Sequence, residues 1–213
     1  MTRLALVTGA SRGLGTVMAE ALAPDFHILA VARTIGGLED LDDRIKARGG
    51  AATLAPLDVT DDGAMQHLCR SVHDRWGGLD LWVHTAIHAA PLTPANMVEG
   101  KAWDNSVAVN IEATRRLITY VAPLLQAREG ARAVFLDDDR AGQAFFGCYG
   151  VTKAAQMALV RCWQAETRRH GPQVIVLQPE PVATALRARF FPGEDKSRLT
   201  DLRAEGARLV AQL

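Results

Sequence analysis

Near its start the chain reads Leu4-Ala5-Leu6-Val7-Thr8-Gly9-Ala10-Ser11-Arg12-Gly13-Leu14-Gly15. The apolar run at its beginning, Leu4–Thr8, predicts a β-strand that is covered on both faces. The glycines that follow predict a tight turn, because glycine accepts backbone angles that are closed to other residues. After the turn, the pattern from Leu14 to Ala23 indicates a helix. A strand, a glycine-rich turn and a helix in this order form the first unit of an α/β domain.

The turn itself has the chemistry of an anion site. Glycine lets a diphosphate approach the backbone closely, and the N-terminus of the following helix offers free N–H groups with a partial positive charge. An ordinary tight turn is the alternative, but the position directly after the first strand argues against it. We therefore expect this loop to contact a dinucleotide through Gly9, Ser11, Arg12, Gly13, Leu14 and Gly15.

Downstream, short β-rich runs alternate with longer helical patterns. Further strands are expected at residues 26–32, 52–57, 79–84, 131–136 and 173–177. Further helices are expected at residues 38–47, 61–76, 102–126 and 149–170, followed by two short helical stretches. Such alternation implies parallel strands joined by right-handed helical crossovers. The predicted fold class is α/β: residues 1–213 form a single domain with a Rossmann-type, doubly wound parallel sheet of about six strands between two helical layers.

Composition excludes several other classes. The chain has 213 residues, with 24 Lys and Arg against 24 Asp and Glu, so it lacks the basic excess of nucleic-acid binders. It has no apolar run of about 18 residues, which argues against a membrane span. The first strand begins too early to leave room for a signal peptide, and the 3 cysteines are too scattered for a disulfide framework or a zinc site. These features favour a cytoplasmic protein.

The end of the second expected strand discriminates between the two nicotinamide dinucleotides. An acidic residue there would bind the ribose hydroxyls of NAD. This chain instead has Val31-Ala32-Arg33-Thr34, with no carboxylate before Glu39. Arg33, with Arg12 as a second clamp, could pair with the 2′-phosphate of NADP(H) through bidentate guanidinium geometry. Two solvated loop arginines are the alternative. Asp58, after the third strand, is a candidate acceptor for the adenine amino group or else a capping residue.

A tyrosine and a lysine are spaced for acid–base chemistry. Tyr149 opens an expected helix, and Lys153 lies four residues later, on the same face. A phenol has an ordinary pKa of about 10, and a nearby ammonium lowers it by favouring the phenolate. Such a pair suits proton exchange during the interconversion of a carbonyl and an alcohol. The spacing alone also occurs by chance.

Together these motifs resemble the short-chain dehydrogenase/reductase superfamily, in family order and over nearly the whole chain. The matching residues are Thr8-Gly9, Gly13, Gly15, Leu57-Asp58-Val59, Val109-Asn110, Tyr149, Lys153, Pro179 and Thr184. The resemblance implies that Tyr149 donates a proton and that Lys153 binds the nicotinamide ribose. It also implies that Asn110 holds a water in a proton relay, that Thr184 touches the carboxamide, and that Val59, Ala86 and Pro179 contact the cofactor.

The chain departs from the family pattern at several positions. The family expects a serine about 12 or 13 residues before the tyrosine, whereas this chain has Asp137-Asp138-Asp139-Arg140, with Asp137 as the candidate at the serine position. Ile87 replaces a glycine after the fourth strand and could crowd the cofactor. Glu180 replaces a glycine after the sixth. The strand that commonly ends family members is also missing, which favours a dimer or a monomer over a tetramer.

Two functional hypotheses follow. The first is an NADP(H)-dependent oxidoreductase that interconverts a small-molecule carbonyl and a secondary alcohol. The second is a catalytically impaired relative that still binds the dinucleotide. A structural core that binds no nucleotide would require the glycine loop to be accidental. A homodimer is expected, because residues 102–126 and 149–170 carry more apolar side chains than one sheet face can cover. Those side chains are Leu117, Leu124, Met157, Val160 and Trp163. His84 and His88 are interpreted as strand-end or loop residues.

Overall fold

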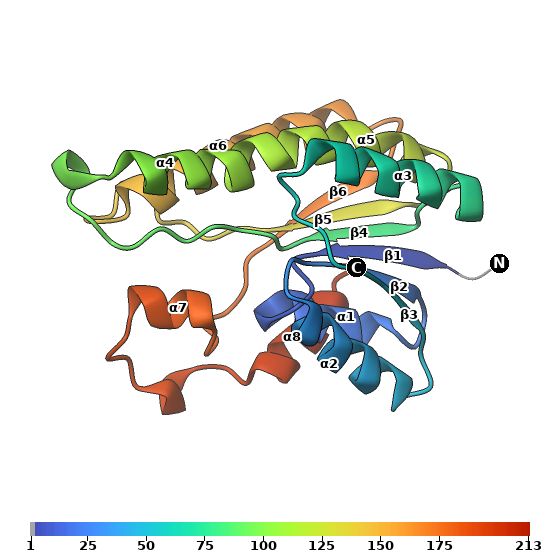
Figure 1. The fold of residues 1–213 in the computed structure, drawn as a ribbon, viewed down its shortest axis with the longest axis horizontal. Coiled ribbons are helices and arrows are strands. Elements are labelled where there is room, and N and C mark those ends of the chain that lie inside the picture. The colour runs from blue at the N-terminus through green and yellow to red at the C-terminus, as the bar shows by residue number, and fades with distance from the viewer. Residues whose placement is uncertain (1–2) are drawn as a thin grey trace.

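The computed structural model describes residues 3–213, and these contribute six strands to one parallel sheet (Figure 1). The strands are β1 (Leu4–Thr8), β2 (His27–Val31), β3 (Ala52–Ala55), β4 (Leu81–His84), β5 (Arg132–Leu136) and β6 (Gln173–Leu177). Their order is β3-β2-β1-β4-β5-β6. The sheet order reverses direction at β1, which confirms the predicted doubly wound architecture.

Helices cover both faces of this sheet (Figure 1). On one face lie α1 (Gly13–Leu22), α2 (Ile35–Lys46) and α8 (Leu202–Val210). On the other face lie α3 (Asp62–Trp76), α4 (Gly100–Ser106), α5 (Thr114–Gln126) and α6 (Gly147–Glu166). The short helix α7 (Ala185–Phe190) lies beyond the carboxyl ends of the strands, and two 3₁₀ turns occur at Ala95–Met97 and Lys196–Arg198. The predicted three layers are therefore present.

Strand β1 shows why both faces are covered. Leu4 and Leu6 belong to the apolar cluster beneath α5 and α6, whereas Ala5 and Val7 belong to the cluster beneath α1 and α2. All are at most 1% exposed. Alternate side chains of a strand point to opposite faces, and each buried leucine contributes about 1.5–3 kcal/mol. A strand that is apolar at every position is therefore stable only between two helical layers.

The helix expected over residues 102–126 is instead interrupted. The chain forms α4, then a π-helical turn over Val107–Ala113, then α5. Periodicity of apolar residues did not reveal this turn, because a single wide turn shifts the pattern by only one residue. Asn110 lies in the middle of the turn, and its backbone oxygen accepts a hydrogen bond from Thr114 Oγ1 at 2.9 Å.

The apolar residues on which the dimer expectation was based are buried within the chain itself. This corrects that argument, because they pack against the sheet and are not left over for a partner. The residues are Leu117, Leu124, Met157, Val160 and Trp163. Within residues 3–213, no helix is long and apolar enough to cross a membrane.

Candidate active site

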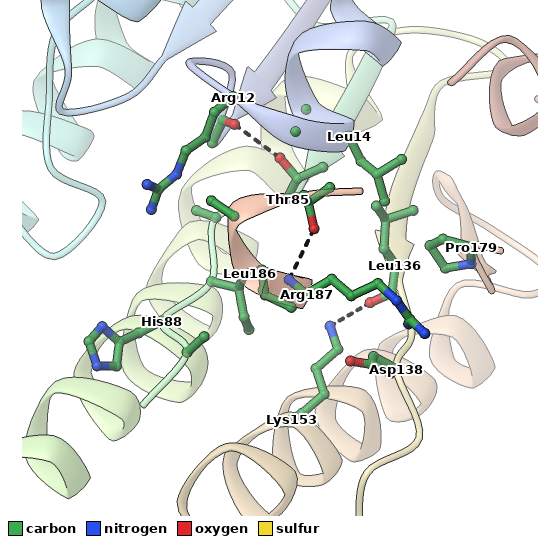
Figure 2. A pocket seen from close by; sticks show the side chains of 18 of the residues that line it. Arg12, Leu14, Thr85, His88, Leu136, Asp138, Lys153, Pro179, Leu186 and Arg187 are labelled. Atoms are coloured by element: carbon green, nitrogen blue, oxygen red, sulfur yellow. Dashed lines mark hydrogen bonds between the residues drawn. The ribbon is translucent and has the colours of Figure 1, made fainter. Parts of the chain in front are cut away.

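A cavity of about 970 Å³ opens at the carboxyl ends of the strands (Figure 2). Its walls combine the glycine turn after β1, the segments after β2 to β6, the first turns of α6, and α7. Every residue expected to touch the cofactor lines it: Gly9, Ser11, Arg12, Gly13, Leu14, Gly15, Arg33, Asp58, Val59, Ala86, Lys153, Pro179 and Thr184. Tyr149 and Asp137 line it too, whereas Asn110 is buried behind the wall.

The glycine turn is shaped by close backbone contacts. A Cβ atom on Gly9 would lie 2.7 Å from the backbone nitrogen of Ala86, and one on Gly15 would collide with the Gly9 carbonyl. Thr85, which the sequence analysis did not select, donates its hydroxyl to Thr8 O at 2.9 Å and contacts Gly9 O at 3.3 Å. Thr85 thus ties the turn to the segment after β4, so these glycines are required by packing.

The start of α1 suits an anion. Gly13 has a φ of +61°, and a Cβ atom on it would lie 3.6 Å from Thr184 Cγ2. The helix has no side-chain cap and no acidic residue in its first turn, so the first N–H groups keep their hydrogen-bonding capacity. Free N–H groups at a helix N-terminus attract phosphate oxygens. These features fit the diphosphate of a dinucleotide.

Arg33, after β2, and Asp58, after β3, form an ion pair at the cavity wall. Arg33 Nη1 is 3.6 Å from Asp58 Oδ2, and the Arg33 side chain is 66% exposed. Burial opposes ionisation of Asp58, but two hydrogen bonds from Thr60 and the charge of Arg33 outweigh it and lower the pKa of the Asp58 carboxyl. Arg33 is therefore an exposed cation in a loose ion pair, and such pairs contribute little stability, so its guanidinium is available to an anionic ligand.

Tyr149 lies at the opposite end of the cavity. It is 3% exposed, and its hydroxyl donates to Asp138 Oδ2 at 3.1 Å. Burial and the neighbouring Asp138 carboxylate raise the pKa of the phenol, while Arg140 opposes them weakly. The predicted lowering of this pKa by Lys153 is therefore wrong for the free protein, because burial and Asp138 dominate.

The three consecutive aspartates diverge. Asp137 continues the β5–β6 pairing through its N–H, which donates to Leu177 O at 2.8 Å, and its carboxylate pairs with Arg161 at 2.8 Å. The Asp138 carboxylate forms an ion pair with Arg140 Nε at 2.8 Å and accepts a hydrogen bond from the Tyr149 hydroxyl. Asp138, and not Asp137, is thus the aspartate whose carboxylate contacts the Tyr149 hydroxyl, and the assignment of Asp137 to the serine position stays a prediction.

Lys153 does not contact the Tyr149 hydroxyl. Its ammonium donates to the carbonyl of Leu136, shown in Figure 2, and to Gln156 Oε1 at 2.8 Å. Lys153 is 7% exposed. Burial lowers the pKa of its ammonium to about 8, against the opposing influence of Asp137 and Asp138. It is therefore a desolvated cation at the cavity wall.

Asn110 is held by protein partners. Its Oδ1 accepts from the N–H of His88 at 2.7 Å, and its Nδ2 donates to His88 O at 3.0 Å and to Thr152 Oγ1 at 2.9 Å. Both amide hydrogens of Asn110 are therefore used in hydrogen bonds within the protein. The side chain thus joins the segment after β4 to α6, and the expected role of Asn110 in a proton relay stays a prediction.

An apolar cluster closes the reacting end. Phe190 of α7 contacts both Phe146 and Tyr149 with ring centroids 4.9 Å apart. Ile87 packs against this cluster, so it forms part of an apolar wall beside the reacting groups. The Arg187 guanidinium of α7 donates two hydrogen bonds to the Glu194 carboxylate. Within residues 3–213, no group of His, Cys, Asp and Glu side chains is placed to hold a metal ion.

Comparisons with known proteins agree with this geometry. A model of the short chain dehydrogenase family matches residues 3–195. Among curated proteins, sorbitol dehydrogenase of Cereibacter sphaeroides is 29% identical over 180 residues, which cover 83% of this chain and 69% of that protein.

Two solved structures share the fold. An oxidoreductase of Escherichia coli superposes with a TM-score of 0.91 at 25% identity, covering 98% of this chain and 87% of that one. A Shigella flexneri protein complexed with NADP has a TM-score of 0.89 at 26% identity, covering 94% of this chain and 86% of that one.

Proposed function

Because the chain belongs to the short-chain dehydrogenase family, with a match over residues 3–195, we propose that it is an NADP(H)-dependent oxidoreductase of small-molecule carbonyls and secondary alcohols. One observation carries the proposal. A single cavity joins the glycine turn and Arg33 at one end to Tyr149 and Lys153 at the other. The NADP held by the Shigella flexneri relative supports the choice of dinucleotide.

In this proposal, different residues bind the cofactor and hold the proton. NADPH, when bound, supplies the hydride. Gly9, Gly13 and the free N–H groups of α1 would hold its diphosphate, and Arg33 and Arg12 its 2′-phosphate. Tyr149 stays protonated because its pKa is raised, so it keeps the proton that a reduced carbonyl oxygen needs. The apolar wall around Phe190 would exclude water from an apolar substrate.

A second function is favoured by one contact. The Tyr149 hydroxyl donates to Asp138, so in the free protein its proton is directed at a carboxylate and away from the place of a substrate oxygen. An ionised carboxylate cannot donate to that oxygen, and it repels the negative charge that develops there. The second candidate function is therefore a protein that binds NADPH but reduces carbonyls inefficiently.

Fluorescence titration with NADPH, followed by NADPH oxidation against a panel of ketones and aldehydes, tests both functions. The proposed enzyme binds NADPH and oxidises it with at least one class of carbonyl. Binding without oxidation across the panel supports the second function. Absence of binding contradicts both.

A homodimer is also proposed, now on different residues. The outer face of α6 carries a stripe of exposed small or apolar side chains, Val151, Ala154 and Ala158, and Val151 is 51% exposed. Small residues allow two helices to approach closely around a two-fold axis. Light scattering at micromolar protein should give a dimer mass, and Val151→Asp with Ala158→Asp should reduce it. A monomer mass for the wild type would contradict this proposal.

A further inference from the structure

A buried chain of hydrogen bonds joins Lys153 to the interior of the sheet. Gln156, one turn further along α6, is 1% exposed and accepts from the Lys153 ammonium at 2.8 Å. The amide nitrogen of Gln156 donates to Thr114 Oγ1 at 2.8 Å. The amide is therefore oriented from both ends, with its oxygen toward the ammonium and its nitrogen toward α5.

Thr114 is the branching point of this chain. It donates its only hydroxyl hydrogen to Asn110 O at 2.9 Å, so it must accept from both Gln156 and His84. His84 Nε2 lies 3.1 Å from Thr114 Oγ1, and His84 Nδ1 lies 2.7 Å from Thr8 Oγ1. A neutral imidazole with its proton on Nε2 satisfies each of these contacts. The orientation of Gln156 is thus fixed by the ammonium, which can only donate, and by Thr114 Oγ1, which accepts from the Gln156 amide.

The same contacts limit what Lys153 can do. An ammonium has three hydrogens, and the carbonyl of Leu136 and the amide oxygen of Gln156 each take one. One hydrogen is left, on a side chain that lines the cavity. Without Gln156 the ammonium would have two unsatisfied hydrogens and a wider choice of positions.

We propose that Gln156 is the positioning residue of Lys153, and that Thr114 and His84 orient its amide so that one ammonium hydrogen stays available to the dinucleotide. The proposal rests on the proposed NADP(H)-dependent function. Gln156 suits this place because an amide accepts from Lys153 and donates to Thr114 at once. A glutamate could only accept, and it would add a negative charge beside the ammonium.

The charges around Lys153 define what a titration reports. Asp137 and Asp138, after β5, are the carboxylates that act on it. His84 of β4 is neutral, because burial lowers its pKa to about 3, and Tyr149 of α6 stays protonated. Asn110 of the π-helical turn and Thr114 of α5, which belong to the same hydrogen-bond network, are uncharged. A change at position 156 is therefore read directly in the protonation of Lys153.

The contact is tested by NMR of lysine labelled with ¹³C at Cε. The chain has lysines at positions 46, 101, 153 and 196, so the spectrum is simple, and a Lys153→Met variant assigns the buried one. Gln156→Glu should raise the titration midpoint of Lys153 by about one pH unit or more, since a carboxylate favours the ammonium. Gln164→Glu is the matched control, because Gln164 lies two turns along α6 and binds Val174 O at 2.7 Å. Equal midpoints in the two variants would overturn the contact.

The positioning role is tested by NADPH affinity, which needs no turnover. Thr114→Val keeps the shape of the side chain but removes the acceptor of Gln156, and NADPH binding should weaken about tenfold. Thr114→Ser retains the hydroxyl and should bind within about twofold of the wild type. Circular dichroism checks that each variant is folded.

The outcomes separate the inference from the proposed function. Unchanged affinity in folded Thr114→Val overturns the positioning role. Wild-type binding of NADPH without oxidation of any carbonyl refutes the proposed reaction, while the Lys153 midpoint and the Thr114 affinities still decide the role of Gln156. Absence of NADPH binding by the wild type overturns both.

Discussion

The two ends of the cavity are built by different parts of the chain. After β1, the backbone makes the site, through the glycine turn and the uncapped start of α1. After β4 and β5, side chains make it, through the contacts of Tyr149 with Asp138 and of Lys153 with Gln156. Backbone geometry tolerates no side chain at Gly9 or Gly15, whereas a side-chain contact can be replaced by another. The first end therefore conforms to the family, and the second end departs from it.

If side chains set the reacting end, then Asp138→Ser should have the largest effect. A serine hydroxyl can donate to a substrate carbonyl and no longer competes for the Tyr149 proton, so kcat should rise by about 10²–10³-fold. NADPH oxidation with simple ketones at pH 7.5 is the measurement. Asp137→Ser and Asp139→Ser are the controls and should leave kcat unchanged. Rapid turnover of such ketones by the wild type would show that the carboxylate does not impair the site.

If the backbone sets the cofactor end, then Gly15→Ala should weaken NADPH binding by about 100-fold. Its Cβ would meet the Gly9 carbonyl and Thr85, and backbone atoms cannot move away cheaply. Gly36→Ala is the control, because a Cβ there meets no atom within 4 Å. It lies in α2, where alanine should raise the free energy of unfolding by about 0.5–1 kcal/mol. If Gly15→Ala and Gly36→Ala bind NADPH with equal affinity, the backbone at Gly15 does not determine cofactor binding.

Arg33→Ala tests a side chain at the cofactor end. Loss of its charge-assisted bond to the 2′-phosphate should weaken NADPH binding about ten- to a hundredfold and leave NADH binding unchanged. Both dissociation constants are measured by fluorescence titration. Equal affinities of the wild type for the two dinucleotides would refute the preference for NADP(H).

Alkaline pH should act on Lys153. Burial lowers its pKa to about 8, so the ammonium prevails below that pH and the neutral amine above it. NADPH affinity should therefore fall about fivefold between pH 7 and 9, as the remaining donor loses its charge. Lys153→Met should bind weakly and without this dependence. An unchanged wild-type affinity up to pH 9 would show that the charge of Lys153 is not used.

The sequence predicted what repeats along the chain. Strand and helix alternation gave all six strands, and β1 and β6 have the predicted bounds. The residues expected at the cofactor all line the cavity, because most of them follow a strand closely and Lys153 is placed by the first turns of α6. The sequence did not reveal the bond between Gln156 and Thr114, which are 42 positions apart. It also did not reveal that Asp138 is the aspartate in contact with Tyr149, because choosing between neighbouring aspartates requires knowing where the strand pairing ends.

The π-helical turn over Val107–Ala113 has a consequence for insertions and deletions. Such a turn is equivalent to one residue inserted into an α-helix. Deleting one residue there would restore regular winding and rotate α4 relative to α5 by about 100°. Asn110 would then swing away from His88, which it clamps through two hydrogen bonds. Length changes of a single residue in this helix should thus be far less tolerated than substitutions on its exposed face.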